Sequence, residues 1–368
     1  MSLIGLTGRI CLTSPGVAKK RRMSTRIYFV EIIAFLYCVP IRTSVYLLKT
    51  IGKTEMFETE TVILLGAGAS MPYDFPSGRT LLFEIARSLN EGILHIKRGG
   101  DPDYAPLVYR SIIEHKIARQ SIEFFAEDLS KTMQPSIDSF LEMYPEYVEM
   151  GKVAIAASLI PHVSLGNITS RNQQDIKWYE YFFNLLGSPH NIVRMKQLSI
   201  VTFNYDRSLE YFLFNAFMNS YHLDSTQAID LMKRIPIIHI YGELGLPTFF
   251  SKDGRDYDTK VDIENIKKCV EGIKIMPEIE DSHSALGDVH KVLSEAGKLI
   301  VIGFSYHPVN VIRLKLGETY KGKVVGTVKG MEDGEVLRVR KTLYQYSIHE
   351  AELHQFDALN FLRKTDYL

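Results

Sequence analysis

The segment TFNYDRSLE, residues 202–210, places an amide and a carboxylate at the end of an apolar run. Asn204 and Asp206 are two residues apart, so on an extended chain their side chains share one face. An amide and a carboxylate on one face of a strand end can grip the hydroxyl groups of a ribose. The alternative role for Asp206 is a cap on the helix that follows.

A second polar pair, His239 and Tyr241, lies in the segment IPIIHIYGELG and alternates with isoleucines. This alternation predicts that the two side chains share one face of a short strand. Histidine is suited to general acid–base chemistry, and His239, like Asn204, lies close to an expected turn. The alternative is a histidine satisfied within the core, and the spacing leaves open whether His239 or Tyr241 reaches a site.

The segment TVILLGAGASMPYDFPSG, residues 61–78, passes from an apolar run through a Gly-rich turn into helical spacing. A strand, a Gly-rich turn and a helix are how a doubly wound sheet presents backbone N–H groups to a phosphate. The full G-x-G-x-x-G motif is lacking, because Met71 stands at the third glycine. The alternative is a turn whose glycines only let a strand pack closely on a helix.

Strand-like and helical segments alternate along the chain. Apolar runs at TVILL, LSIVTF, IPIIHI, KLIVIGF and KVVGTV predict strands, and ELHQFDALNFLR predicts a closing helix. Residues 79–90 read as an amphipathic helix, and residues 91–188 read as a large, mostly helical insertion in which Ser136 caps a helix. We therefore expect an α/β fold, with a Rossmann-like, mostly parallel sheet and helices on both faces.

The composition narrows the class of protein. The 368 residues include 43 basic and 43 acidic side chains, so the chain lacks the basic excess of a dedicated nucleic-acid binder. Cys11, Cys38 and Cys269 are far apart and form no CxxC pair. This favours a cytoplasmic protein without a structural zinc site.

Residues 1–55 read as an N-terminal extension. A basic stretch, KKRRMSTR, precedes an apolar run that Glu31 interrupts. The run is shorter than the roughly 20 apolar residues of a membrane span, so membrane contact is not expected. Two interpretations stay open: an added core helix or strand pair, or a natural start at Met56.

Taken in order, the segments GAGAS, SIDSFL, TFNYD, HIYG and IGFSYHPVN resemble the sirtuin-like domain of bacterial antiphage defence proteins. The resemblance spans residues 56–368. It implies catalytic roles for Asn204, Asp206, His239 and Tyr241. It also implies NAD-contacting positions, which are Gly66, Ala67, Gly68, Ala69, Ser70, Asp138, Gly303, Phe304, Ser305 and Asn310.

The sequence departs from the sirtuin pattern at two points. Tyr241 stands before Gly242, where sirtuins have their histidine base, so His239 is the candidate base here. The four-cysteine zinc module of protein deacylases is absent from the sequence. The resemblance therefore implies hydrolysis of NAD⁺, which is the substrate, without a metal ion.

The same resemblance implies control of a toxic activity. Chains of this kind pair with a HerA-type ATPase or a short Argonaute, or assemble into homo-oligomers. Two other functions stay open: a non-catalytic, nucleotide-sensing domain of the same fold, and an NAD-dependent protein deacylase.

Overall fold

The computed structural model describes residues 59–169, 176–194, 198–275 and 285–367. All of these belong to one compact unit, Met56–Leu368. The expected N-terminal extension, residues 1–55, lies outside the described residues. Within them, no helix combines the length and the apolar character needed to cross a bilayer.

The core of the fold is a six-stranded sheet in the order β3-β2-β1-β4-β5-β6, in which every pair of neighbours is parallel. The strands are β1 (Thr61–Leu65), β2 (Leu198–Thr202), β3 (Ile237–His239), β4 (Lys298–Ile302), β5 (Val324–Thr327) and β6 (Ala351–His354). All five residues of β1 are buried. A parallel strand covered on both faces is expected to be apolar throughout, rather than alternating.

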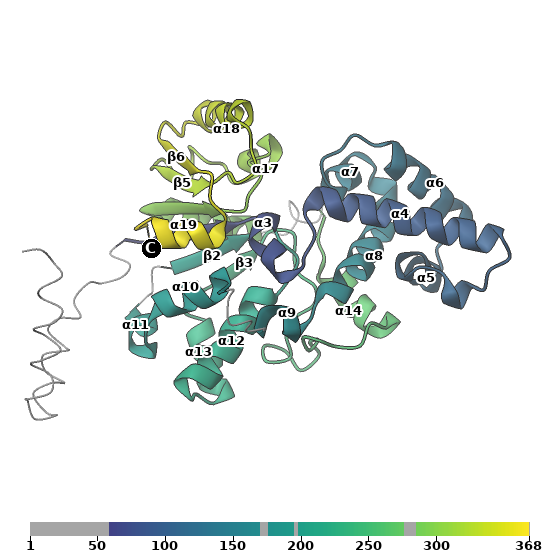
Figure 1. Ribbon diagram of the computed structural model, residues 1–368, viewed down its shortest axis with the longest axis horizontal. Helices are drawn as coiled ribbons and strands as arrows, with labels where there is room; N and C mark the ends of the chain where they lie inside the picture. Colours follow the sequence, from purple (N-terminus) through teal and green to yellow (C-terminus); the bar gives the residue numbers. More distant parts are fainter. Residues whose placement is uncertain (1–58, 170–175, 195–197, 276–284, 368) are drawn as a thin grey trace, which may run out of the picture. The chain divides into compact units, whose positions relative to one another are not determined.

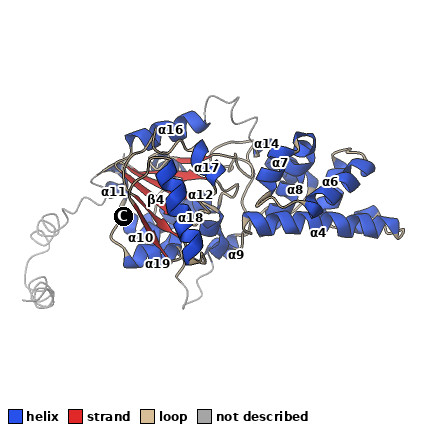
Figure 2. Cartoon of the chain, turned by 90° about the horizontal axis from the view of Figure 1, so that it is seen from above, coloured by secondary structure: helices blue, strands red, loops and turns tan. Residues whose placement is uncertain are grey.

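Helices cover both faces of this sheet, which confirms the expected Rossmann-like α/β class. Figure 2 shows α10 and α19 on one side of the strands and α16 on the other. The helices that follow β2 are α12 (Ser208–Tyr221), α13 (Ser225–Met232), α14 (Ile263–Gly272), α16 (Ala285–Glu295), α17 (Pro308–Arg313), α18 (Asp333–Gln345) and α19 (Ala358–Lys364).

The chain between β1 and β2 is helical in its described parts. Its helices are α3 (Ala67–Ser70), α4 (Gly78–Lys97), α5 (Leu107–Glu114), α6 (Arg119–Lys131), α7 (Ile137–Met143), α8 (Val148–Leu159), α9 (Leu165–Thr169), α10 (Trp178–Leu186) and α11 (Pro189–Arg194). Helices α4 to α8 gather beside the sheet, and α14 joins them from later in the chain (Figure 1). Helix α8 is buried on nearly all sides, as expected for the centre of a small helical bundle.

The predicted boundaries of this region need adjustment. The first helix does not end near Asn90 but continues to Lys97 as part of α4. The predicted cap of α7 is confirmed, because Ser136 Oγ accepts the backbone N–H of Ser139 at 3.3 Å.

The end of the chain also differs from the prediction. The segment ELHQ, expected as helix, lies mostly in the edge strand β6, which pairs with β5. Helix α19 begins only at Ala358, because Asp357 caps it by accepting the N–H of Asn360 at 2.8 Å.

The strand order fixes where a ligand is expected. β1 pairs with β2 on one side and with β4 on the other. The strands β2 and β3 are added on one side of β1, and β4, β5 and β6 on the other, so the topological switch point lies between β1 and β4. In doubly wound sheets the crevice at the carboxyl ends of these two strands is the usual ligand site. The turns after β1, β2, β3 and β4 all lie at this edge.

Candidate functional site

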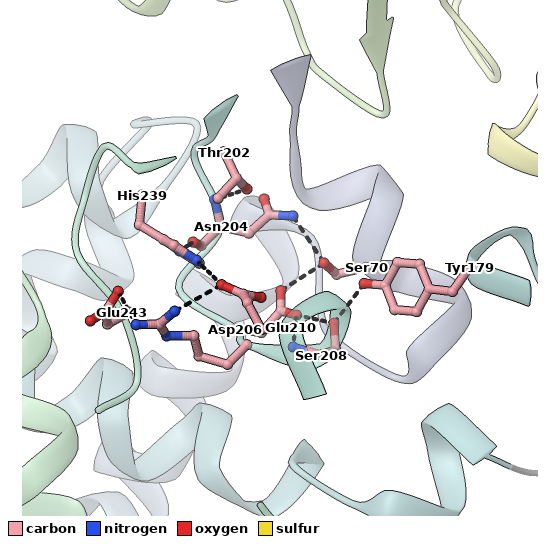
Figure 3. A network of polar contacts seen from close by, with 10 residues as sticks. Ser70, Tyr179, Thr202, Asn204, Asp206, Ser208, Glu210, His239 and Glu243 are labelled. Carbon is pink, nitrogen blue, oxygen red and sulfur yellow. Dashed lines mark hydrogen bonds and ion pairs between the residues drawn. The ribbon is translucent and has the colours of Figure 1, made fainter. Parts of the chain in front are cut away.

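Asn204 joins the end of β2 to the turn after β1. Its side-chain Nδ2 donates to the carbonyl of Gly66 at 3.0 Å. The same nitrogen donates to Ser70 Oγ at 2.9 Å, a contact that Figure 3 shows. The backbone N–H of Asn204 donates to Thr202 Oγ1 at 3.0 Å. Both amide hydrogens are thus used by protein acceptors, so the group that Asn204 offers a ligand is its amide oxygen.

Asp206 lies in the turn before α12, two residues ahead of the first helical residue, Ser208, and its hold on ribose hydroxyls stays a prediction. Its Oδ1 accepts the backbone N–H of Ser208 at 3.1 Å, at the start of α12, and also the Ser208 hydroxyl. Its Oδ2 accepts from Ser70 Oγ at 2.6 Å. Burial raises the pKa of Asp206, although these donors favour the ionised form. The carboxylate therefore belongs to a closed network that also includes Tyr179, whose hydroxyl is 2.6 Å from Ser208 Oγ.

The Gly-rich turn packs directly on the turn after β4. Gly66 N donates to the carbonyl of Ile302 at 3.0 Å, and Gly68 N donates to that of Gly303 at 2.9 Å. A Cβ on Gly66 would lie 2.6 Å from Gly303 O, and one on Gly68 would lie 2.8 Å from Gly303 Cα. Both glycines are thus required by backbone packing, and their N–H groups already have acceptors within the protein.

His239 is buried and contacts protein acceptors through both ring nitrogens. Nδ1 is 2.8 Å from the carbonyl oxygen of Asn204, and Nε2 is 2.7 Å from Glu210 Oε1. Arg207 Nη1 donates to the same Glu210 oxygen at 2.9 Å, and Arg207 Nη2 lies 2.6 Å from Glu243 Oε2. His239, Glu210, Arg207 and Glu243 form a chain of alternating charge, which we call the buried charge chain (Figure 3).

Within the buried charge chain, His239 and Glu210 shift each other's pKa values. Burial alone would lower the pKa of His239, but the Glu210 carboxylate outweighs it and raises that pKa. Burial alone would raise the pKa of Glu210, but His239 and Arg207 lower it to about 2. The two shifts agree in direction, because each group favours the charged form of the other.

Tyr241 belongs to a different cluster from His239. The strand β3 ends at His239, so the two side chains do not share a strand face as predicted. The Tyr241 hydroxyl donates to Asn310 Oδ1 at 3.1 Å and accepts from Arg313. Arg313 also donates to Asn310 Oδ1 at 2.9 Å and pairs with Glu142 of α7.

Asp138 lies beside this second cluster. It accepts a hydrogen bond from the Tyr205 hydroxyl, and the Tyr205 ring lies 6.2 Å from that of Tyr241. Burial raises the pKa of Asp138, whereas the Tyr205 hydroxyl and Arg313 act in the opposite direction. Residues of α7 and of the sheet edge thus meet here.

The other predicted positions are distributed around the two turns. Ala69 is buried, and its carbonyl accepts the indole N–H of Trp178 at 2.7 Å, while Ala67 is half-buried. Phe304 is buried against Phe203, with ring centroids 5.0 Å apart. Ser305 is exposed.

The sequence analysis did not single out several charged or hydroxyl-bearing partners, among them Glu142, Tyr205, Glu210 and Arg313. Tyr205 and Glu210 stand inside the same segment, TFNYDRSLE, that drew attention to Asn204. Glu142 and Arg313 are far apart in the chain, and only the folded structure brings them together.

Two pockets lie away from the Gly-rich turn. One, of about 360 Å³, opens beyond β3 and is lined by His239, Glu243, Arg255, Lys268 and Lys274, among other residues. The other, of about 460 Å³, lies between α18 and β6.

The described residues contain no group of three or more His, Cys, Asp or Glu side chains arranged to hold a metal ion. Cys269 is buried, and its thiol lies 3.6 Å from the carbonyl of Leu244. The other two cysteines, Cys11 and Cys38, lie outside the described residues.

A scan against protein-family models and a search of curated proteins both found no significant match to this chain.

Proposed function

We propose that the chain hydrolyses NAD⁺ at the bond between nicotinamide and ribose, and that it does so in the cytoplasm. One observation carries the proposal: Asn204 binds Gly66 and Ser70 at the carboxyl edge of the sheet. This contact unites the two segments that are expected to hold the diphosphate and the ribose. It lies where a sheet of order 3-2-1-4-5-6 takes a dinucleotide.

The chemistry needs few groups. Nicotinamide leaves with its bonding electrons, the anomeric carbon gains oxocarbenium character, and a water adds its oxygen there and releases a proton. The amide oxygen of Asn204 is the fixed acceptor that can orient this water or a ribose hydroxyl. Its direction is set by the two hydrogen bonds on Nδ2, so it is organised before substrate binds.

A second candidate function is a non-catalytic nucleotide sensor. It is favoured because polar groups of the site already have hydrogen-bond partners within the protein. The N–H groups of Gly66 and Gly68, and both nitrogens of His239, already contact protein acceptors. A sensor needs no free base. Such a domain would bind NAD⁺ without consuming it, so measuring binding and turnover on one preparation separates the two functions.

The resemblance to antiphage defence proteins supplies the proposed setting. NAD⁺ hydrolysis would deplete the infected cell and would be released by a partner protein or by self-assembly. Turnover should therefore be measured for the chain alone and together with the protein encoded beside it.

The variant Asn204→Ala tests the proposed function. We expect NAD⁺ cleavage to fall by roughly 10²-fold or more, the scale for a group that positions reactants. Asn90→Ala is the matched control, because Asn90 Nδ2 also donates to a carbonyl and a serine hydroxyl, those of Ala86 and Ser130. Its turnover should equal that of the parent.

Thermal melting on the same samples separates catalysis from stability. Loss of the Asn204 hydrogen bonds costs stability of about 0.5–1.5 kcal/mol each, which leaves a folded protein to assay. Full turnover per folded molecule in Asn204→Ala would refute the assignment.

A further inference from the structure

We propose that His239 is held as an imidazolium ion by Glu210, and that it positions Asn204 instead of accepting a proton from the attacking water. Glu210 is then a positioning residue that acts through His239. The catalytic part rests on the proposed function, whereas the charge state of His239 does not.

The partners of the ring determine where its protons are. Nδ1 lies 2.8 Å from the carbonyl oxygen of Asn204, and a carbonyl can only accept a hydrogen bond. Nδ1 therefore carries a hydrogen. A neutral imidazole would have to leave Nε2 without one, with its lone pair facing Glu210.

Glu210 is an acceptor as well. The oxygen that lies 2.7 Å from Nε2 also accepts from Arg207 Nη1 at 2.9 Å. Beside the Arg207 cation, the ionised carboxylate is the stable form, and an ionised carboxylate only accepts. Nε2 therefore carries a hydrogen too, and the ring is positively charged.

The surroundings balance this charge. Glu210 comes from α12, Arg207 from the turn before it, and Glu243 from the turn after β3. The side chains of His239, Glu210 and Arg207 are at most 6% exposed, so water screens them little. The raised pKa of His239 and the lowered pKa of Glu210 have the directions expected for this arrangement.

His239 and Glu243 also line the 360 Å³ pocket, whose other lining residues include five charged side chains. These are Asp253, Arg255, Lys268, Glu271 and Lys274. This set has both signs, and Glu210 is the carboxylate in hydrogen-bond contact with the ring. The charge state of His239 is thus set chiefly by Glu210.

The positioning role follows from the place of the contact. The imidazolium donates to the backbone carbonyl of Asn204, while the Asn204 side chain donates to Gly66 and Ser70. Asn204 is therefore held through its backbone carbonyl and through its side-chain amide. Loss of either proton from His239 would set a lone pair against an oxygen and release one of these contacts.

The direct experiment is a pH titration of the full chain, labelled with ¹⁵N at histidine and asparagine, by NMR. We expect both nitrogens of His239 to be protonated at pH 7, and the side-chain amide signals of Asn204 to shift with the same midpoint as His239. The variants His239→Gln and Asn204→Ala assign the signals. A neutral His239 at pH 7, or an Asn204 amide indifferent to its titration, would overturn the inference.

The second experiment compares pH profiles of NAD⁺ cleavage. A base gains activity as pH rises through its pKa, whereas a positioning imidazolium loses it, so we expect a falling limb above pH of about 6.5. In Glu210→Gln the falling limb should move to lower pH, with turnover at pH 7.5 reduced roughly 10-fold. Glu127→Gln, which removes an exposed partner of Lys131, is the control and should keep the parent profile.

The outcomes distinguish failure of the positioning role from failure of the proposed function. A rising limb would refute the positioning role of His239. Absence of NAD⁺ cleavage both by the chain alone and by the chain together with the protein encoded beside it would refute the proposed function. The titration would still decide the charge of His239 and its effect on Asn204.

Discussion

Asn204 is held from two sides. Its amide reaches the turn after β1, and its carbonyl receives His239 from β3. Its neighbours at the Gly-rich turn are fixed by backbone contact: Gly66 and Gly68 lie against Gly303, whose φ is +64°. The small size of these glycines therefore allows the turns after β1 and β4 to pack in direct contact.

Gly68→Ala tests this packing. A Cβ 2.8 Å from Gly303 Cα forces the two turns apart, so we expect a loss of about 1–3 kcal/mol in the free energy of unfolding, the usual cost of overpacking. Gly334→Ala is the matched control in α18, where an added Cβ meets nothing within 4 Å. Because Gly334 is the second residue of α18, the free energy of unfolding should rise by less than the roughly 0.5–1 kcal/mol expected in a helix interior.

Urea denaturation of both variants measures the difference. Equal stability of Gly68→Ala and the parent would show that the turns separate at no cost. We expect the effect to fall on folding, because the atoms nearest to the added Cβ belong to the backbone of Gly303.

The helix α7 connects the helical insertion to the sheet edge. Asp138 and Glu142 lie on it, and they bind Tyr205 and Arg313. Its start is capped by the Ser136 side chain, whereas Ala118, the residue before α6, has no side chain that could cap that helix. Helix capping can therefore be tested by removing the cap of α7 and by adding one to α6.

We expect Ser136→Ala to lower the free energy of unfolding by about 1 kcal/mol, because an N–H at the start of α7 loses its acceptor. We expect Ala118→Ser to raise it by about 0.5–1 kcal/mol, since the extended backbone at Ala118 suits a capping serine. Chemical denaturation of both variants provides the comparison. Changes of the same sign would show that capping does not control either helix.

Elements with a strong local pattern were predictable. The run TVILL predicted β1, and Ser136 marked the start of α7. The run ELHQ did not reveal β6, because an edge strand with half-buried residues has no apolar pattern to distinguish it from a helix. The candidate site was predictable in its amides and glycines, but Arg313 and Glu142 meet only through tertiary folding.

Three of the buried ionisable side chains, His239, Glu210 and Arg207, lie together in the buried charge chain. In the buried charge chain, a positive His239 contributes stability only while it keeps its proton. Because its folded pKa is raised above about 6.5, this contribution is complete below that pH and is lost as the pH rises through the folded value. Asp206 and Asp138, whose pKa values are also raised, act in the same direction at lower pH.

We therefore expect the free energy of unfolding to fall as the pH rises above about 6.5, and to fall less steeply in His239→Gln. On the acid side the contribution of Glu210 is lost as the pH drops below about 4.5 toward its folded pKa of about 2. Denaturation curves at a series of pH values measure both limbs. Parallel alkaline limbs in the parent and in His239→Gln would contradict the expectation.

The central position of β1 has a consequence for how the chain folds. Thr61 pairs with Leu198 and with Lys298, so the first strand of the sheet finds its neighbours only after the whole helical insertion has followed it. Long-range pairings of this kind are slow, whereas the helices from α4 to α8 make contacts close in sequence. Until β2 and β4 arrive, an apolar strand, TVILL, stands with both edges open and is a ready template for association with another chain. Synthesis of this protein therefore has a vulnerable interval, which ends when β4 pairs with β1.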